Sequence, residues 1–186
     1  MKKMVYLVAI PNGMLQHCAN KIQQSIWEKY DLGIDEFPEI HITIDAFYYE
    51  DQEELEKITH ELENIISKIK AFEVSVNGFG HIPSPHNCIT LHVVKTEELK
   101  KVYSQIHTNM KKRGFDVRDF SPEEIVFHIS LAGLHGRIWS ESESLSAWED
   151  VRHFKFREIS LLQEFQLWHL DLNSDGKIIT RIKLNQ

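Results

Sequence analysis

The tetrapeptides His41-Ile42-Thr43-Ile44 and His128-Ile129-Ser130-Leu131 share one pattern: a histidine, an apolar residue, a hydroxyl residue and a second apolar residue. Both lie in short stretches whose apolar residues are mostly β-branched, which is typical of strands. Because successive side chains of a strand point to opposite faces, the histidine and the hydroxyl residue share one face and the apolar residues the other. The pattern therefore predicts two strands, each with a polar pair on an open face and an apolar pair in a core.

Chance alone accounts for part of this pattern. Ser and Thr make up about a tenth of the chain, so about one His-x-Ser/Thr is expected among its 11 histidines. The shared apolar flanks and the equivalent strand positions make the pair of tetrapeptides more specific than either one. The alternative is an interaction protein whose two strand histidines are only structural.

The elements around the two motifs follow the same order twice, which indicates an internal duplication. We expect a single domain over residues 1–186, with one lobe at about 2–77, a second at about 88–166, and a closing hairpin at 168–184. The predicted fold class is α+β, with two pseudo-symmetric lobes, each a mostly antiparallel sheet with helices on its outer side, and a central cleft between them. The expected strands are 4–10, 39–48, 72–76, 88–94, 125–131, 158–166, 168–172 and 178–184, and the expected helices are 15–33, 51–69, 96–113 and 144–154.

Composition narrows the class of partner. The chain has 186 residues, 42% of them hydrophobic, and a net charge of −7, which argues against a broad basic surface for duplex DNA. Two cysteines, Cys18 and Cys88, lie far apart and indicate neither a disulfide framework nor a zinc knuckle. The apolar run near the N-terminus is too short for a membrane anchor. We expect a cytoplasmic monomer that binds no membrane and needs no cofactor.

Two imidazoles on either side of one phosphorus suit phosphoryl transfer. A neutral imidazole takes a proton from a water or a ribose hydroxyl, and a protonated one gives a proton to the departing oxygen. The hydroxyls of Thr43 and Ser130 are placed to donate hydrogen bonds to the nonbridging oxygens. No step requires a metal, and the sequence leaves open which of His41 and His128 is the acid.

At these residues the chain resembles the 2H phosphoesterase superfamily, which includes 2'-5' RNA ligase-like proteins and cyclic nucleotide phosphodiesterases. The resemblance extends over nearly the whole chain, through residues 5–11, 38–40, 78–80, Gly114 and 159–162. It implies that His41 and His128 are catalytic and that Thr43 and Ser130 bind phosphate.

The expected substrates are a 2',3'-cyclic phosphate or a 2'-5' linkage in a small nucleotide or at an RNA end. A nucleotide- or RNA-end-binding module of the same fold without chemistry is the alternative. The chain departs from the common family pattern at Phe127, where proline often stands, and at Asp45 and Ala46, where an apolar run often follows the first motif. The acidic Asp45 bears on substrate preference more than on catalysis.

Other residues are candidates for substrate binding. Arg137 is a possible phosphate ligand or a solvated loop residue, and Tyr48 either stacks on a base or belongs to the core. His81 lies in an irregular segment with His86 and either lines the cleft or is an exposed loop residue, since no partner suggests a metal. The basic residues either guide RNA or cap a helix through its dipole; they are Lys111, Lys112, Arg113 and Arg118.

Overall fold

The computed structural model describes residues 2–33, 38–134, 137–169 and 177–186. Within these residues the chain forms four helices and nine strands. None of the helices in these ranges is long and apolar enough to cross a membrane. The helices are α1 (Gly13–Tyr30), α2 (Gln52–Ile66), α3 (Glu97–Lys112) and α4 (Glu141–Val151). The strands are β1 (Lys3–Ala9), β2 (Ile42–Tyr49), β3 (Phe72–Ile82), β4 (Cys88–Val93), β5 (Asp116–Val117), β6 (His128–Ala132), β7 (Arg157–Leu162), β8 (Glu164–His169) and β9 (Ile178–Lys183).

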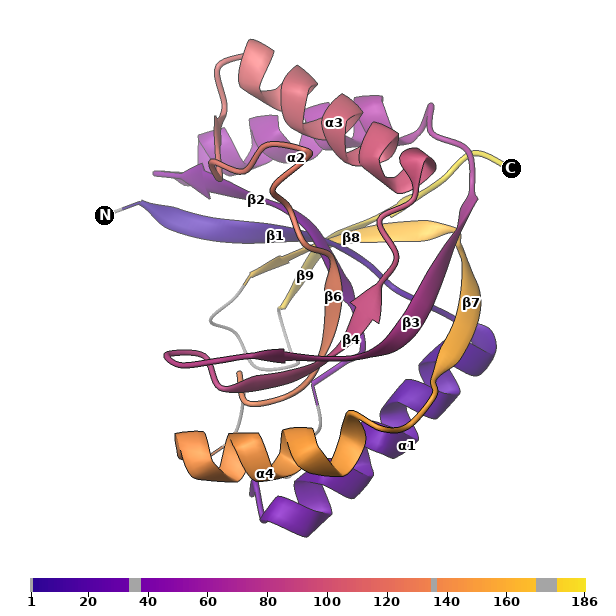
Figure 1. The fold of residues 1–186 in the computed structure, drawn as a ribbon. Coiled ribbons are helices and arrows are strands. Elements are labelled where there is room, and N and C mark those ends of the chain that lie inside the picture. Colours follow the sequence, from indigo (N-terminus) through magenta and orange to yellow (C-terminus); the bar gives the residue numbers. More distant parts are fainter. Residues whose placement is uncertain (1, 34–37, 135–136, 170–176) are drawn as a thin grey trace.

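The strands form two antiparallel sheets. The first sheet has the order β5-β2-β1-β8-β9 and the second the order β6-β4-β3-β7. Helices α2 and α3 pack on the first sheet, and α1 and α4 pack on the second, so the helices lie at opposite ends of the molecule (Figure 1). This arrangement confirms the predicted α+β fold of two lobes with antiparallel sheets.

Each sheet contains strands from both halves of the sequence. Strand β3 comes from the first half but pairs with β4 and β7, and β8 comes from the second half but pairs with β1. Helices α1 and α3 cross over in the same way, because α1 packs on β6 and β7 while α3 packs on β2 and β5. The sheets therefore do not follow the expected lobe boundaries at 2–77 and 88–166.

Some predicted strand boundaries were wrong. The expected strand at 158–166 is two strands, β7 and β8, which are separated at Gln163 and belong to different sheets. The two strands also differ in burial, since β7 alternates between exposed and more buried positions whereas residues 165–168 of β8 are all buried. Strand β3 continues to Ile82 through a segment expected to be irregular. Strands β8 and β9 pair as a hairpin, and its expected turn at 173–176 lies outside the described residues.

A β-bulge in β2 changes which side chains face the helices. Leu7 of β1 pairs with Asp45 and Val8 pairs with Thr43, so Ile44 is the extra residue on β2. Simple alternation would place Asp45 on the face of Thr43, but the bulge turns it to the opposite face, which α2 and α3 cover. Tyr48, by the same register, shares the face of Thr43.

The second motif strand also contains a bulge. Thr90 of β4 pairs with Ser130 and Ile89 pairs with Ala132, so Leu131 is the extra residue on β6. Its carbonyl oxygen accepts a hydrogen bond of 2.7 Å from the indole Nε1 of Trp27 on α1. Each motif strand thus leaves regular pairing just after its hydroxyl residue, and a residue of another element binds at that point.

Gly133 tests the packing directly after the second motif strand. Its backbone has φ +105°, and a Cβ at this position would meet the carbonyl oxygen of Asn87 and lie 2.9 Å from Trp139 Nε1. We expect Gly133→Ala to lower the free energy of unfolding by about 1–3 kcal/mol, measured by urea denaturation. The control is Gly78→Ala, where φ is +80° and no atom lies within 4 Å. Equal destabilisation by the two variants would contradict the packing argument.

Candidate active site

His41 is held in place just before β2. Its Nδ1 lies 2.7 Å from the carbonyl oxygen of Glu39, and its ring centroid lies 4.7 Å from that of Trp168 on β8. The indole is itself fixed, because its Nε1 donates a 2.8 Å hydrogen bond to Oε1 of Gln166. Backbone and aromatic contacts therefore restrict the orientation of the His41 imidazole.

His128 begins β6 and has a similar backbone contact. Its Nδ1 lies 3.4 Å from the carbonyl oxygen of Val126, a longer and weaker contact than that of His41. Burial lowers the pKa of His128 below its ordinary value, and the positive charge of Arg118 acts in the same direction, against the contact with Val126. The lowered pKa favours the neutral imidazole at pH 7.

The two imidazoles are positioned in equivalent ways. In each, Nδ1 contacts the carbonyl oxygen of the residue two positions earlier in the chain. Because a carbonyl only accepts hydrogen bonds, Nδ1 carries the proton and Nε2 holds the lone pair of the neutral ring. The strands that carry the motifs, β2 and β6, contact each other where the two sheets meet. Both motifs thus lie at the junction of the sheets.

The two hydroxyl residues lie on the same faces as their histidines. Thr43 and Ser130 are both half-buried, so neither is sealed in the core. Opposite Ser130 on β4 lies Thr90, which is buried. Burial raises the pKa of the neighbouring Cys88 thiol to about 11. The thiol stays protonated near neutral pH, which makes Cys88 unsuited to act as a nucleophile.

The weaker candidates lie in different environments. Tyr48 is half-buried on the face of Thr43. His81 lies on the face that α4 covers, where its Nε2 is 2.7 Å from the buried Ser144 Oγ and its ring stacks on Trp148. This placement gives His81 a packing role against α4.

Arg137 connects two surface segments. Its guanidinium forms an ion pair of 2.8 Å with Glu143 at the start of α4. It also donates to the carbonyl oxygens of Tyr30 and Asp31 at the end of α1. These contacts use the guanidinium to hold α1 and α4 together, so we do not include Arg137 among the phosphate ligands.

The basic residues at and after the end of α3 do not form one patch. Lys111 and Lys112 lie in the last turn of α3, where the helix dipole favours cations. Arg113 forms an ion pair of 2.8 Å with Glu61 of α2. Arg118 instead contacts β2, the strand of the first motif. Of the four, Arg118 is the one that contacts a motif strand, through Ile44 and Asp45.

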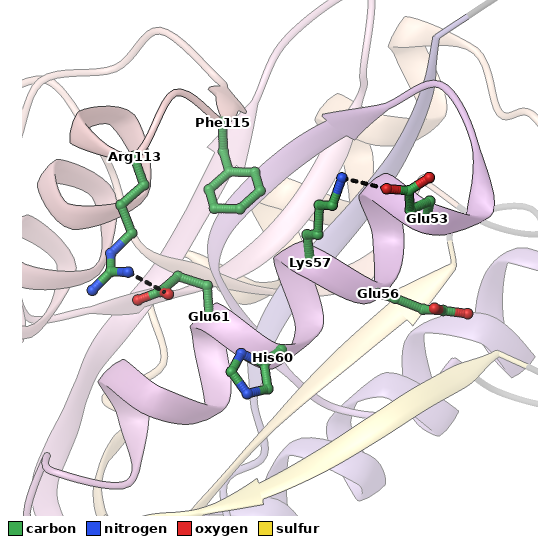
Figure 2. A pocket seen from close by; sticks show the side chains of 7 residues that line it. All are labelled: Glu53, Glu56, Lys57, His60, Glu61, Arg113 and Phe115. Carbon is green, nitrogen blue, oxygen red and sulfur yellow. Dashed lines mark hydrogen bonds and ion pairs between the residues drawn. The ribbon is translucent and has the colours of Figure 1, made fainter.

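A hollow of about 690 Å³ lies between α2 and the end of α3 (Figure 2). Lys57 pairs with Glu53 and Arg113 pairs with Glu61 along its walls, and Phe115 lies between them (Figure 2). None of the four motif residues lines this hollow, which lies on the helix-covered side of the first sheet. Among the residues that the structure describes, no group of three or more metal-ligating side chains is placed to hold an ion.

The structure brings residues to the motifs that the sequence did not single out. His92 pairs with His128 across β4 and β6 and is the exposed residue of its otherwise buried strand. Directly opposite residues have Cβ atoms about 4.5–5.5 Å apart, so the two imidazoles are neighbours. Lys177 places its Nζ 3.5 Å from the ring centroid of Trp168, beside His41. The strand register reveals His92 and a tertiary contact reveals Lys177, so neither follows from the local sequence.

Comparison with known proteins identifies the family. A family model described as the 2'-5' RNA ligase superfamily matches residues 5–168. The chain belongs to this superfamily. The resemblance to the 2H phosphoesterases that the two motifs indicated is thereby confirmed.

Relatives of this 2H family member include proteins from bacilli. A protein of Bacillus thuringiensis strain Al Hakam named "Putative phosphoesterase" is 31% identical over 102 residues. That match covers 55% of this chain and 56% of the relative. A similarly named protein of Bacillus cereus strain B4264 is 30% identical over 104 residues, 56% of this chain and 58% of that protein. The chain thus matches somewhat more than half the length of these relatives.

Solved structures share the fold of this family member at low sequence identity. A crystal structure of a phosphoesterase matches with a TM-score of 0.61 and 12% identity, over 100% of both chains. A protein of Thermus thermophilus, TT0787, matches with a TM-score of 0.60 and 11% identity over 97% of both chains. LigT of E. coli without ligand matches with a TM-score of 0.58 and 12% identity over 100% of this chain and 99% of LigT.

The surroundings of His128 predict how it titrates. Because burial and the charge of Arg118 both disfavour the imidazolium, its pKa in the folded protein lies below the ordinary value of about 6.5. Protonation of His128 therefore needs a lower pH than protonation of a solvated histidine. We expect its imidazole resonances to titrate below pH 6.5 by NMR. A midpoint at or above pH 6.5 would contradict this assignment.

Proposed function

We propose that this 2H family member is a metal-independent phosphoesterase that acts on 2',3'-cyclic phosphate or 2'-5' phosphodiester bonds of RNA ends or small nucleotides. The observation that carries the proposal is the equivalent placement of His41 and His128. In both imidazoles Nδ1 contacts a backbone carbonyl oxygen, which leaves Nε2 as the nitrogen for proton transfer. Both histidines also precede hydroxyl residues on strands that contact each other at the junction of the sheets.

The two histidines divide the proton transfers of hydrolysis. His128, whose lowered pKa favours the neutral ring, accepts a proton from the attacking water as the water oxygen bonds to phosphorus. His41, as the imidazolium, gives a proton to the ribose oxygen as its bond to phosphorus breaks. The product is a linear phosphomonoester. In ligation a 5'-hydroxyl takes the place of the water.

Thr43 and Ser130 stabilise the charge on phosphorus oxygens. Each hydroxyl lies two residues after its histidine on the same face of its strand. The hydroxyls donate hydrogen bonds to the nonbridging oxygens, whose charge rearranges in the transition state. Two proton-transfer groups and two donors suffice for the reaction without a metal ion.

The substrate class follows from the family fold and the charge. LigT of E. coli, which shares the fold, has been crystallised with 3'-AMP, with phosphate and with ATP. These complexes support a nucleotide as the ligand of this chain. The net charge of −7 favours a small nucleotide or an RNA end over a long polyanion.

Single histidine variants test the mechanism. Because general acid or base catalysis contributes about 10²–10⁴-fold to a rate, we expect His41→Ala and His128→Ala each to lower kcat by that factor. The assay follows 2',3'-cyclic AMP and a 2'-5' linked dinucleotide in the presence of EDTA, with product identification. The control is His60→Ala, on the outer side of α2. Full activity in both motif variants would refute the proposal, and nucleotide binding without product would favour the non-catalytic module.

The hydroxyl donors give a separate prediction. Thr43→Val and Ser130→Ala each remove one donor, so we expect a fall in kcat of about 10²-fold or more with a smaller change in KM. Circular dichroism checks that each variant keeps its fold. A change in KM alone would show that the hydroxyls bind the ground state and the transition state equally.

A further inference from the structure

Arg118 is fixed against the strand of the first motif. Its backbone N–H donates a 3.1 Å hydrogen bond to the carbonyl oxygen of Ala46. Its guanidinium Nη2 donates a 3.0 Å hydrogen bond to the carbonyl oxygen of Ile44, and Nε lies 3.3 Å from Oδ1 of Asp45 as an ion pair. All three partners follow Thr43 directly in the chain. The guanidinium is therefore held beside the phosphate-binding end of β2.

The bulge in β2 provides the backbone contact for Arg118. Ile44 is the extra residue of the bulge, and residues at this position lose regular pairing with the neighbouring strand. Its carbonyl oxygen finds a partner in Arg118. The same bulge turns Asp45 away from the face of Thr43. The carboxylate therefore binds the guanidinium without occupying the face on which Thr43 lies.

The Asp45 carboxylate is fully buried and has a partner for each oxygen. Oδ1 accepts from the backbone N–H of Ala46 at 2.8 Å, and Oδ2 accepts from Nδ1 of His107 at 2.9 Å. Burial and the nearby carboxylate raise the pKa of Tyr103, which keeps its proton and donates to a carbonyl oxygen at 2.6 Å. A buried carboxylate requires such compensation. Arg118 supplies the cation of this network.

Arg118 also lies close to the second motif. Its positive charge acts on the imidazole of His128, so the guanidinium lies within electrostatic reach of both motif strands. The Arg118 side chain is 20% exposed to solvent, whereas the Asp45 side chain is fully buried. A guanidinium has five N–H donors in a fixed plane, and the contacts of Arg118 with Ile44 and Asp45 use only some of them.

We propose that Arg118 is a further ligand of the substrate, binding an anionic oxygen of the phosphate beside His128 while Asp45 holds its guanidinium in place. The inference rests on the proposed function, because it places the phosphate between the two motifs. It gives the acidic residue after the first motif a positioning role behind the site. It also separates Arg118 from Lys111, Lys112 and Arg113, which belong to the end of α3.

The test measures phosphate recognition without turnover. Arg118→Gln removes the charge, and calorimetry compares the affinities of 2'-AMP and 3'-AMP for the variant and the parent protein. Because hydrogen bonds to charged groups contribute about 1.5–3 kcal/mol, we expect both affinities to fall by about 10- to 100-fold. Arg118→Lys keeps the charge but loses the planar fork, and we expect an intermediate affinity.

A matched control separates this local effect from a loss of net charge. Arg113→Gln changes the net charge equally but acts in the hollow between α2 and α3, so AMP affinity should stay within twofold. Asp45→Asn should weaken AMP binding in the same direction as Arg118→Gln, because the guanidinium loses its ion-pair partner. Thermal unfolding followed by circular dichroism establishes which variants are folded.

Different outcomes overturn the inference and the proposed function. Parent-like AMP affinity in folded Arg118→Gln would overturn the role of Arg118, as would equal losses in Arg113→Gln. If Arg118→Gln does not fold, parent-like AMP affinity in Arg118→Lys is the result that overturns it. AMP binding that depends on Arg118, with no turnover of any cyclic or 2'-5' substrate, would overturn only the proposed chemistry.

Discussion

The structure depends on the reciprocal exchange of strands between its two sheets. Strand β1 pairs with β8 from the other half of the sequence, and β4 pairs with β3. Each exchange places the first strand of a half between two neighbours, so that the motif strand lies at the sheet edge, as β6 does, or is followed only by the two-residue strand β5, as β2 is. For this reason β2 and β6 meet at the junction of the sheets and bring together two motifs that are distant in sequence.

The bulges adapt this symmetric frame to its site. In β2 the bulge sends Asp45 into the interior and places Tyr48 on the face of Thr43. In β6 the extra residue is Leu131, whose carbonyl oxygen binds Trp27. Regular strands would have placed a carboxylate on the face of Thr43, where it would repel the phosphate of the proposed substrate. The irregular pairing instead converts that carboxylate into an anchor for Arg118.

Local pattern was enough to predict most elements, the fold class and the polar faces of the motifs. Alternation holds from His41 to Thr43 because those residues precede the bulge, and it fails at Asp45 because a bulge depends on the partner strand. His92 was missed for a related reason, since a histidine in a strand acquires a neighbour only through the register with β6. The sheet to which β3 belongs is likewise set by tertiary pairing and not by its own residues.

The packing of His41 against Trp168 has a consequence for how the molecule is made. Trp168 lies on β8, near the far end of the chain from the imidazole that it contacts. Contacts between residues so distant in sequence form late, because a long loop must close first. During synthesis on the ribosome, both histidine motifs emerge well before the strand that fixes the first one. A partly synthesised chain therefore contains the two histidines of the proposed site without the contact that fixes His41, and this contact forms only after β8 has been made.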